Sequence, residues 1–569
     1  MNSPARLSSI DISGNCTYNT PRNGLPSAAV HFGKQAAGQP EVNAVERSWF
    51  RTHLNQFLFG LYVFLIWASY IYTHYYDWAL PAGGMIALAL AGIMLALVIV
   101  CVPILFRMVG ALSVHPGRRT TLLRRLLVFA AAFAAAYVAA RLWRYTWGYF
   151  VDPEGIYSPD SLEQLEQAVG GKYSDWHPVW HTLLFFKLPL LLTGEKTSII
   201  VFQSIFFCLS IACMTETAYE LGGWRSAVLC FSFVMLNPYT GFLLLHPWKD
   251  AAFASTSLLA VCLAVRLWCA GSERSVSRPT LVLMGLLLAN ATLFRHNGIL
   301  LTLVLLLALL FILGRKRWFL VAAVFVLFIV LIKGPVYHAL DVEKPGNRVV
   351  ETTGLPMTVI GNVVTKNPGA MDGELRDFAY SILTPEEWNK HYQTGNFNFA
   401  KWNSSHLQVI EDAGAATVLR YMFKCFRLAP RESLQGLLAL TELVYAPAGP
   451  IVDELPLMEE YLDKVEPFGV GFTAVSEKLY LDTFLNYCRY IGVSILLVLL
   501  PMLVKCDLWS GRDWQRILIA LSLLCYDFGT MLLLTGPDYR FFYVSLLCSP
   551  ILAVLMLYEN NDEKEKLSA

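Results

Sequence analysis

Long apolar stretches recur along this chain, and they constrain its fold more than any other feature. A helix of about 20 predominantly apolar residues crosses the hydrocarbon core of a bilayer. Stretches near this length lie at 57–76, 84–106, 122–142, 197–214, 226–245, 251–270, 279–296, 299–313, 319–333, 490–505, 517–535 and 541–557. Because backbone polar groups inside a bilayer must be paired within the segment, each stretch favours a helix. The sequence therefore predicts an all-α polytopic membrane protein with about 12 transmembrane helices.

Composition excludes the main alternatives to a membrane protein. Only 15% of the 569 residues are charged and 56% are hydrophobic, whereas soluble domains carry about 25% charged residues. The net charge of +1 gives no basic field that would attract nucleic acid, so we expect no nucleic-acid partner. A further apolar stretch, 181–193, is interrupted by Lys187 and Pro189. It is too short to span, and we expect an interfacial or re-entrant segment.

The basic residues predict the orientation of the spans. Lys and Arg are concentrated in short cytoplasmic loops of membrane proteins. Here they cluster in alternate connections, at Arg107, Arg118, Arg119, Arg124, Arg125, Arg274, Arg278, Arg315, Lys316, Arg317, Lys505, Arg512 and Arg516. These connections fall on one side of the predicted spans, so we expect that side to be cytoplasmic. Both termini would then be cytoplasmic as well.

The predicted spans divide the chain into six parts. They are a disordered cytoplasmic tail at 1–53, two additional N-terminal transmembrane helices at 54–121, a transmembrane core at 122–333 with a first outer loop at 143–196, an extracytoplasmic domain at 334–489, C-terminal transmembrane helices at 490–557 and a cytoplasmic tail at 558–569. The extracytoplasmic domain has helix-like stretches and precedes the last three spans. Its two cysteines, Cys425 and Cys488, could form a disulfide.

Acidic residues follow the third span in the first outer loop. A helix-start pattern at Ser158–Ser161 places Asp160 at a helix N-terminus. There the helix dipole and unpaired N–H groups keep a carboxylate ionised, which suits a general base or a metal-bridging acid. The alternative is that Asp160 only caps the helix. Asp152 lies earlier in the same loop.

The segment SDWHPVWH, which follows in the same loop, contains Asp175, His177 and His181. The histidines are four residues apart, which is one turn if the segment is helical. Such a pair can bind a metal ion. Alternatively, the two histidines hydrogen-bond lipid headgroups, with the neighbouring tryptophans as interfacial anchors.

Cations lie in three other outer connections. Lys249 and Asp250 precede the sixth span, Arg295 and His296 end the seventh, and Arg540 stands between the last two. An arginine at such a depth is costly without a partner and suggests function. Lys249 either pairs with Asp250 or faces a phosphate, and Arg540 could simply reach the headgroups.

These acids and cations are all predicted on one face of the membrane. A lipid-linked phosphate substrate would need both kinds, because cations stabilise the phosphate leaving group and a carboxylate activates an acceptor hydroxyl. The apolar spans would receive the lipid tail.

The order of these motifs resembles the GT-C superfamily of polytopic glycosyltransferases, which use polyprenyl-phosphate sugars. The stretches SPDSLEQLEQA and SDWHPVWHTLL are most similar to uncharacterised bacterial GT-C-like membrane proteins. They are similar, more loosely, to the protein O-mannosyltransferase and lipid A aminoarabinose transferase groups. The resemblance covers roughly 122–333 and 490–557, so spans one and two would be additions before a GT-C-like core.

This resemblance implies a glycosyltransferase of a bacterial plasma (cytoplasmic) membrane, with its active site on the outer face. It would transfer a sugar from a polyprenyl-phosphate donor to a glycan, lipid or protein acceptor of the cell envelope. The acceptor-activating base falls on Asp160, with Asp152 and Asp175 as rivals because the first loop has no Asp-Glu doublet.

By the same resemblance, the residues at the donor phosphate are Lys249, Arg295 and Arg540, and His177 falls in the family's interfacial His-Pro segment. From their positions in the outer connections, we expect His177, His181, Asp250 and His296 to support the site. No cofactor is certain. A divalent metal, Mg²⁺ or Mn²⁺, stays open because the metal requirement varies between GT-C branches.

Two other functions compete with this one. A polysaccharide polymerase or ligase acting on lipid-linked glycans would share the topology and the cationic outer face. A flippase or transporter for lipid-linked glycans would keep ionisable groups near mid-membrane and often shows paired broken helices. Here most charges lie at one interface, and only Lys187 and Asp527 are obvious interior candidates.

Overall fold

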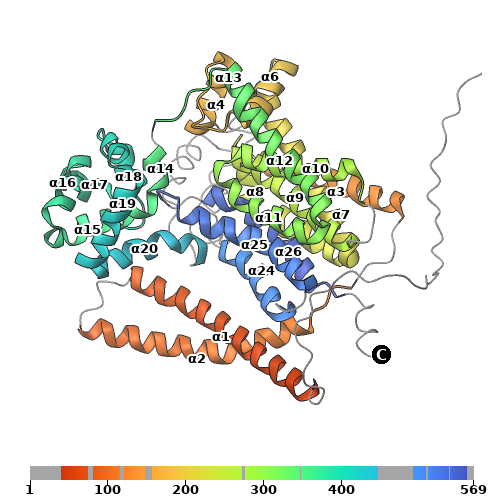
Figure 1. The fold of residues 1–569 in the computed structure, drawn as a ribbon, viewed down its shortest axis with the longest axis horizontal. Helices are drawn as coiled ribbons and strands as arrows, with labels where there is room; N and C mark the ends of the chain where they lie inside the picture. The colour runs from red at the N-terminus through yellow and green to blue at the C-terminus, as the bar shows by residue number, and fades with distance from the viewer. Residues whose placement is uncertain are drawn as a thin grey trace, which may run out of the picture. The chain divides into compact units, whose positions relative to one another are not determined.

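The computed structural model describes residues 40–74, 81–115, 121–147, 157–271, 276–346, 348–445, 491–507, 511–536 and 539–559. All regular elements in these ranges are helices, and residues 53–569 belong to one unit (Figure 1). The all-α membrane class predicted from the sequence is therefore confirmed. Asp152 and Cys488 lie outside the described residues, so neither the rival base nor the disulfide is tested. Cys425 is buried.

The apolar helices account for every predicted span. They are α1 (Pro40–His74), α2 (Pro81–Ala111), α3 (Leu122–Trp147), α7 (Thr197–Met235), α9 (Lys249–Ala270), α10 (Arg278–Phe294), α11 (Ile299–Leu313), α12 (Arg315–Leu331), α24 (Ile491–Lys505), α25 (Gly511–Met531) and α26 (Tyr543–Leu557). Among the described residues, eight helices are long and apolar enough to cross a membrane. The protein is thus a multi-pass membrane protein, while the count of about 12 spans and their orientation stay predictions.

Two predicted spans, 197–214 and 226–245, belong largely to the single element α7. Its helical conformation is interrupted at Gly222 and Gly223, and Gly223 has a φ of 71°. A side chain at Gly222 would meet Val114 and Ser226 at less than 3 Å. These two positions therefore need glycine, for conformation at one and for space at the other.

The arms on either side of this interruption run in opposite directions. Gln203, in the first arm, donates a hydrogen bond to the carbonyl of His246, just before α9 begins. At the end of the second arm, the carbonyl of Met235 accepts a hydrogen bond from Trp143, near the end of α3. The chain continues through the short helix α8 (Pro238–Leu243) to α9.

Helix α9 lies at the centre of the bundle, in contact with α7, α10, α11, α25 and α26. Small residues line it, including Ala252, Ala254, Ser257 and Ala260, and all four are buried. Small side chains let neighbouring helices approach closely, which is how helices associate within a membrane. This packing fixes the position of Lys249 and Asp250, the first two residues of α9.

Three short elements in the first outer loop follow α4 (Pro159–Gly170): α5 (Val179–His181), the π-helix η2 (Thr182–Lys187) and α6 (Leu188–Thr193). Together they make an apolar helical stretch shorter than a span. This length agrees with the prediction that 181–193 is too short to span, and its interfacial or re-entrant place stays a prediction.

The segment 334–489 is helical where it is described. Its helices are α13 (Tyr337–Ala339), α14 (Arg348–Thr352), α15 (Gly354–Lys366), η5 (Pro368–Ala370), α16 (Gly373–Ile382), α17 (Pro385–His391), α18 (Asn398–Asn403), α19 (Gln408–Leu428) and α20 (Pro430–Tyr445). α15, α19 and α20 pack on one another (Figure 1). Asp372 and Thr384 cap α16 and α17, as their side-chain type favours.

The segment between α25 and α26 is attached to these helices. The backbone N–H of Phe397 donates to the carbonyl of Thr535 at 2.7 Å, and Thr535 also donates to the Asn398 side chain at 2.5 Å. A Cβ atom at Gly354 would lie 1.9 Å from the carbonyl oxygen of Leu534, so the backbones approach closely there. The turn η7 (Tyr539–Phe542) comes just after this attachment.

Candidate active site

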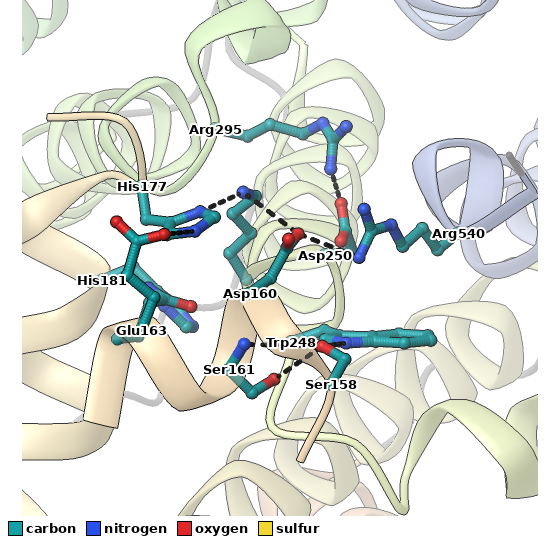
Figure 2. Close-up of polar contacts among 12 residues, drawn as sticks. Ser158, Asp160, Ser161, Glu163, His177, His181, Trp248, Asp250, Arg295 and Arg540 are labelled. Carbon is teal, nitrogen blue, oxygen red and sulfur yellow. Dashed lines mark hydrogen bonds and ion pairs between the residues drawn. The ribbon is translucent and has the colours of Figure 1, made fainter. Parts of the chain in front are cut away.

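The N-terminus of α4 is held against the start of α9. The Ser158 side chain caps α4 by accepting from the N–H of Ser161 at 3.4 Å, and Pro159 occupies the first turn, as the sequence pattern predicted. The indole Nε1 of Trp248 donates to the same Ser158 oxygen at 2.7 Å. Ser158, at the start of α4, is therefore fixed beside Trp248, which precedes Lys249 (Figure 2).

Two further contacts hold the rest of α4. Its buried Gln164 bonds to Nδ1 of His181 at 3.0 Å and to the hydroxyl of Thr182 at 2.9 Å. Near the helix C-terminus, the ammonium of Lys187 donates to the carbonyl of Ala168 at 2.6 Å. The orientation of the helix face that carries Asp160 is thus set at three points.

Asp160 lies between two cations. Its Oδ2 is 3.0 Å from Nη1 of Arg540 and 3.9 Å from Nζ of Lys249, and Figure 2 shows Asp160 beside Arg540. Burial acts to raise the pKa of Asp160, but Arg540 and Lys249 outweigh it and hold the pKa well below the usual range. The side chain is about one-third exposed (32%), so the ionised carboxylate can be reached from outside.

Arg540 reaches Asp160 from η7, and two aromatic rings position it. Its guanidinium lies 5.2 Å from the ring of Trp248 and 5.3 Å from that of Phe541, both within the range of cation–π attraction. The carbonyl of Phe541 accepts from the hydroxyl of Tyr526, in α25, at 2.7 Å.

Lys249 is the middle of a chain of polar contacts. Its Nζ is 2.8 Å from Nδ1 of His177, and Nε2 of His177 is 3.2 Å from Oε2 of Glu163. Burial, and then the charge of Lys249, lower the pKa of His177, which favours the neutral ring. Because an ammonium can only donate, His177 must accept at Nδ1 and donate from Nε2 to the Glu163 carboxylate.

Arg295 and Asp250 form a buried ion pair beside Asp160 (Figure 2). Their side chains are only 8% and 2% exposed. The guanidinium of Arg295 also lies 3.9 Å from the ring of Phe541, and its Nε donates to Asn297 at 2.8 Å. Asp250 therefore pairs with Arg295 rather than with its neighbour Lys249, which is the partner that the sequence suggested.

Asp175 belongs to a separate cluster. Its carboxylate accepts from the Lys333 ammonium at 3.0 Å and from the Tyr337 hydroxyl at 3.0 Å, and Nε2 of His296 lies 3.9 Å away. Lys333 and Tyr337 come from the π-helix η4 (Ile332–Val336) and from α13. This cluster joins the first outer loop to the chain that leads into the helices after residue 348.

The two histidines of the SDWHPVWH segment face different partners. His177 contacts Glu163 and Lys249, whereas the fully buried His181 stacks on Phe185 at 5.1 Å and bonds to Gln164. In the part of the chain that the structure describes, no three His, Cys, Asp or Glu side chains are grouped as metal ligands. The two histidines contact different side chains, and both a metal bound by this pair and a requirement for Mg²⁺ or Mn²⁺ stay predictions.

The structure thus brings most candidate residues together. Asp160, Lys249 and Arg540 are in direct contact, and His177 is bonded to Lys249. The Arg295–Asp250 pair lies alongside Asp160 and Arg540 (Figure 2). His296 and Asp175 form the neighbouring cluster, and His181 is a buried support of α4.

Sequence reasoning missed Glu163 and Trp248. Glu163 lies three residues after Asp160, and residues three apart share a helix face. The helix-start pattern at Ser158 could therefore have indicated Glu163. Trp248 immediately precedes Lys249, but its contact with Ser158 joins residues 90 positions apart, and no local pattern signals such a contact.

Comparison with known proteins gives a family match and two similar structures. Residues 120–401 match DUF6020, described as a family of unknown function. No curated protein matches the sequence. Two similar crystal structures are of ArnT from Cupriavidus metallidurans. The one bound to undecaprenyl phosphate has 13% identity, covers 77% of each chain and has a TM-score of 0.29. The apo structure has 15% identity, covers 75% of this chain and 77% of its own, and has the same TM-score.

At a TM-score of 0.29, neither likeness bears on the function of this chain.

Proposed function

We propose that this protein is a membrane glycosyltransferase that moves a sugar from a polyprenyl-phosphate donor to a cell-envelope acceptor. The observation that carries the proposal is the meeting of Asp160 with Lys249 and Arg540, from three separate elements. Two positive charges and one negative charge leave this trio at +1. A phosphate group can therefore bind here, next to a carboxylate able to accept a proton.

In the reaction we propose, the phosphate of the donor binds Lys249 and Arg540. An oxygen of the acceptor attacks the sugar carbon, and the bond from that carbon to the phosphate oxygen breaks. The lipid phosphate leaves with the electron pair and so gains negative charge, which the two cations stabilise more strongly than they stabilise the bound donor. Asp160 takes the proton of the acceptor hydroxyl.

Donor binding would also activate Asp160. While Arg540 and Lys249 pair with it, its lowered pKa makes it a weak base. When the donor phosphate takes over these cations, Asp160 loses their stabilisation but stays partly buried, so its pKa rises. The base would therefore become effective when the donor is in place.

The buried Arg295–Asp250 pair would serve as a support in this proposal. Arg295 is already paired with Asp250 and packs on Phe541, next to Arg540. We therefore assign it the placement of Arg540 and a longer-range contribution to the positive field, rather than direct phosphate contact. Lipid tails would lie along the apolar helices.

The test is transfer of labelled sugar from a panel of polyprenyl-phosphate donors, with purified protein in lipid and cell-envelope acceptors. Wild-type protein should transfer sugar, Asp160→Asn should abolish transfer while retaining donor binding, and Arg540→Gln should chiefly lower turnover. Transfer that survives Asp160→Asn would move the base to Asp152 or Asp175. If no donor in the panel is transferred or hydrolysed, the glycosyltransferase proposal is wrong, and a flippase becomes the better hypothesis.

A further inference from the structure

The chain Glu163–His177–Lys249 contains two residues that the proposed reaction does not yet use. We propose that Glu163 and His177 form a positioning pair for Lys249: Glu163 selects the ring tautomer of His177, and His177 then directs the Lys249 ammonium to the donor phosphate. This inference rests on the proposed function, because it concerns how that site binds its phosphate.

The tautomer follows from the contacts. In a neutral imidazole, one nitrogen carries the proton and the other accepts. A carboxylate can only accept, so Glu163, at 3.2 Å, favours the proton on Nε2 of His177. This leaves Nδ1 as an acceptor, 2.8 Å from the ammonium of Lys249. The other neutral tautomer would point an N–H group at a cation.

Burial makes this selection necessary. The side chain of His177 is 2% exposed, whereas that of Glu163 is 44% exposed. Water can therefore not correct a wrong tautomer at His177. Glu163 is in turn held by Gln167, whose amide donates to its other oxygen at 3.2 Å, and the bond to His177 lowers the pKa of Glu163 and keeps it ionised.

The direction of Lys249 matters because its side chain is flexible. A lysine loses much rotamer freedom when it is fixed, and a bond to His177 fixes it before the donor arrives. The ammonium then lies 3.9 Å from Asp160, between the base and the histidine. Of its three N–H groups, one donates to His177 and one points toward Asp160. The third is available to a phosphate oxygen.

Glu163→Gln tests the selection of the tautomer. A glutamine amide is neutral and can present either its oxygen or its NH₂ group to Nε2, so it no longer selects one tautomer of His177. We expect kcat/KM for the donor to fall about 10- to 100-fold, which is the effect of losing one hydrogen bond to a charged group. Most of the loss should be in kcat, since the leaving phosphate gains charge, and KM for the acceptor should stay unchanged.

His177→Asn and His177→Leu separate positioning from packing. An Asn side chain can place its oxygen close to where Nδ1 was, and the Lys249 ammonium favours that orientation of the amide, so His177→Asn should retain donor kcat/KM within a few-fold. In that background, Glu163→Gln should have no further effect. His177→Leu fills the buried space without an acceptor and should lose as much as Glu163→Gln does in the wild type.

The matched control is Glu166→Gln, which neutralises an exposed carboxylate on the same helix and should behave as wild type. The inference is overturned if Glu163→Gln has wild-type donor kinetics, or if His177→Leu is more active than His177→Asn. The proposed function would survive either result, provided that wild type transfers sugar and Asp160→Asn does not. If wild type transfers from no donor, both fall together.

Discussion

Arg540 gives the sharpest prediction about the site, because it sets the protonation of Asp160. At an effective dielectric constant of about 20, charges 3.0 Å apart attract by about 5.5 kcal/mol. The same estimate for Lys249 at 3.9 Å is about 4 kcal/mol. Both are reduced by the one-third exposure of Asp160. Removing a buried carboxylate from water costs several kcal/mol, so either cation alone would roughly balance burial, and both together exceed it.

Arg540→Gln should therefore raise the pKa of Asp160 in the free protein. A base whose pKa rises is protonated at higher pH, so the acid limb of kcat/KM for the donor should move upward in pH. In the wild-type protein with donor bound, the phosphate already occupies Arg540. The acid limb of kcat should then lie at higher pH than that of kcat/KM, and Arg540→Gln should move it much less. We also expect kcat to fall about 10²- to 10³-fold.

The assay is sugar transfer at saturating and at limiting donor from pH 4 to 9, with protein integrity checked at each pH. Arg420→Gln is the control, since Arg420 pairs with Glu374 on the exposed surface of α19 and α16. Identical acid limbs of kcat/KM in Arg540→Gln and wild type would refute the coupling between Arg540 and Asp160, even if the variant is slow.

Three more substitutions test other contacts. Trp248→Phe keeps a ring near Arg540 but removes the bond to Ser158, so turnover should fall by less than about 10-fold, as one neutral hydrogen bond allows; a larger loss would contradict this. Arg516→Gln removes a buried cation that donates to carbonyls at the end of α26 and pairs with Asp513. The free energy of unfolding should therefore drop by about 3 kcal/mol, while KM for the donor stays unchanged. An unchanged melting temperature would count against this prediction. Gly223→Ala should destabilise by about 1–2 kcal/mol, because its φ of 71° is strained for a side chain; denaturant unfolding measures this.

Much of the fold follows from hydropathy and helix signals. The apolar stretches predicted helices at every span, and the capping pattern placed the start of α4 at Ser158 and Pro159, where the structure has it. The number of spans does not follow in the same way. Separate spans were predicted at 197–214 and 226–245, whereas the structure has the single element α7 there, interrupted at Gly222 and Gly223.

The sequence predicted which residues belong to the site better than it predicted which of them pair with one another. Depth and charge singled out Lys249, Arg295 and Arg540 because uncompensated cations near a bilayer are costly. They could not show that Arg295 pairs with Asp250 while Lys249 turns to His177. Such choices depend on how α4, α9 and η7 pack, and therefore on contacts between residues far apart in the chain.

The interruption of α7 affects where the residues that follow it can lie. A residue returns to the same side of a bilayer only after an even number of crossings. Asp160 and Lys249 lie 3.9 Å apart, and α7 is the long helix between them. If its 39 residues ran straight, they would extend about 58 Å, far more than one bilayer core, and α7 would carry the chain away from Asp160. The interruption at two glycines thus lets the acid and the lysine meet.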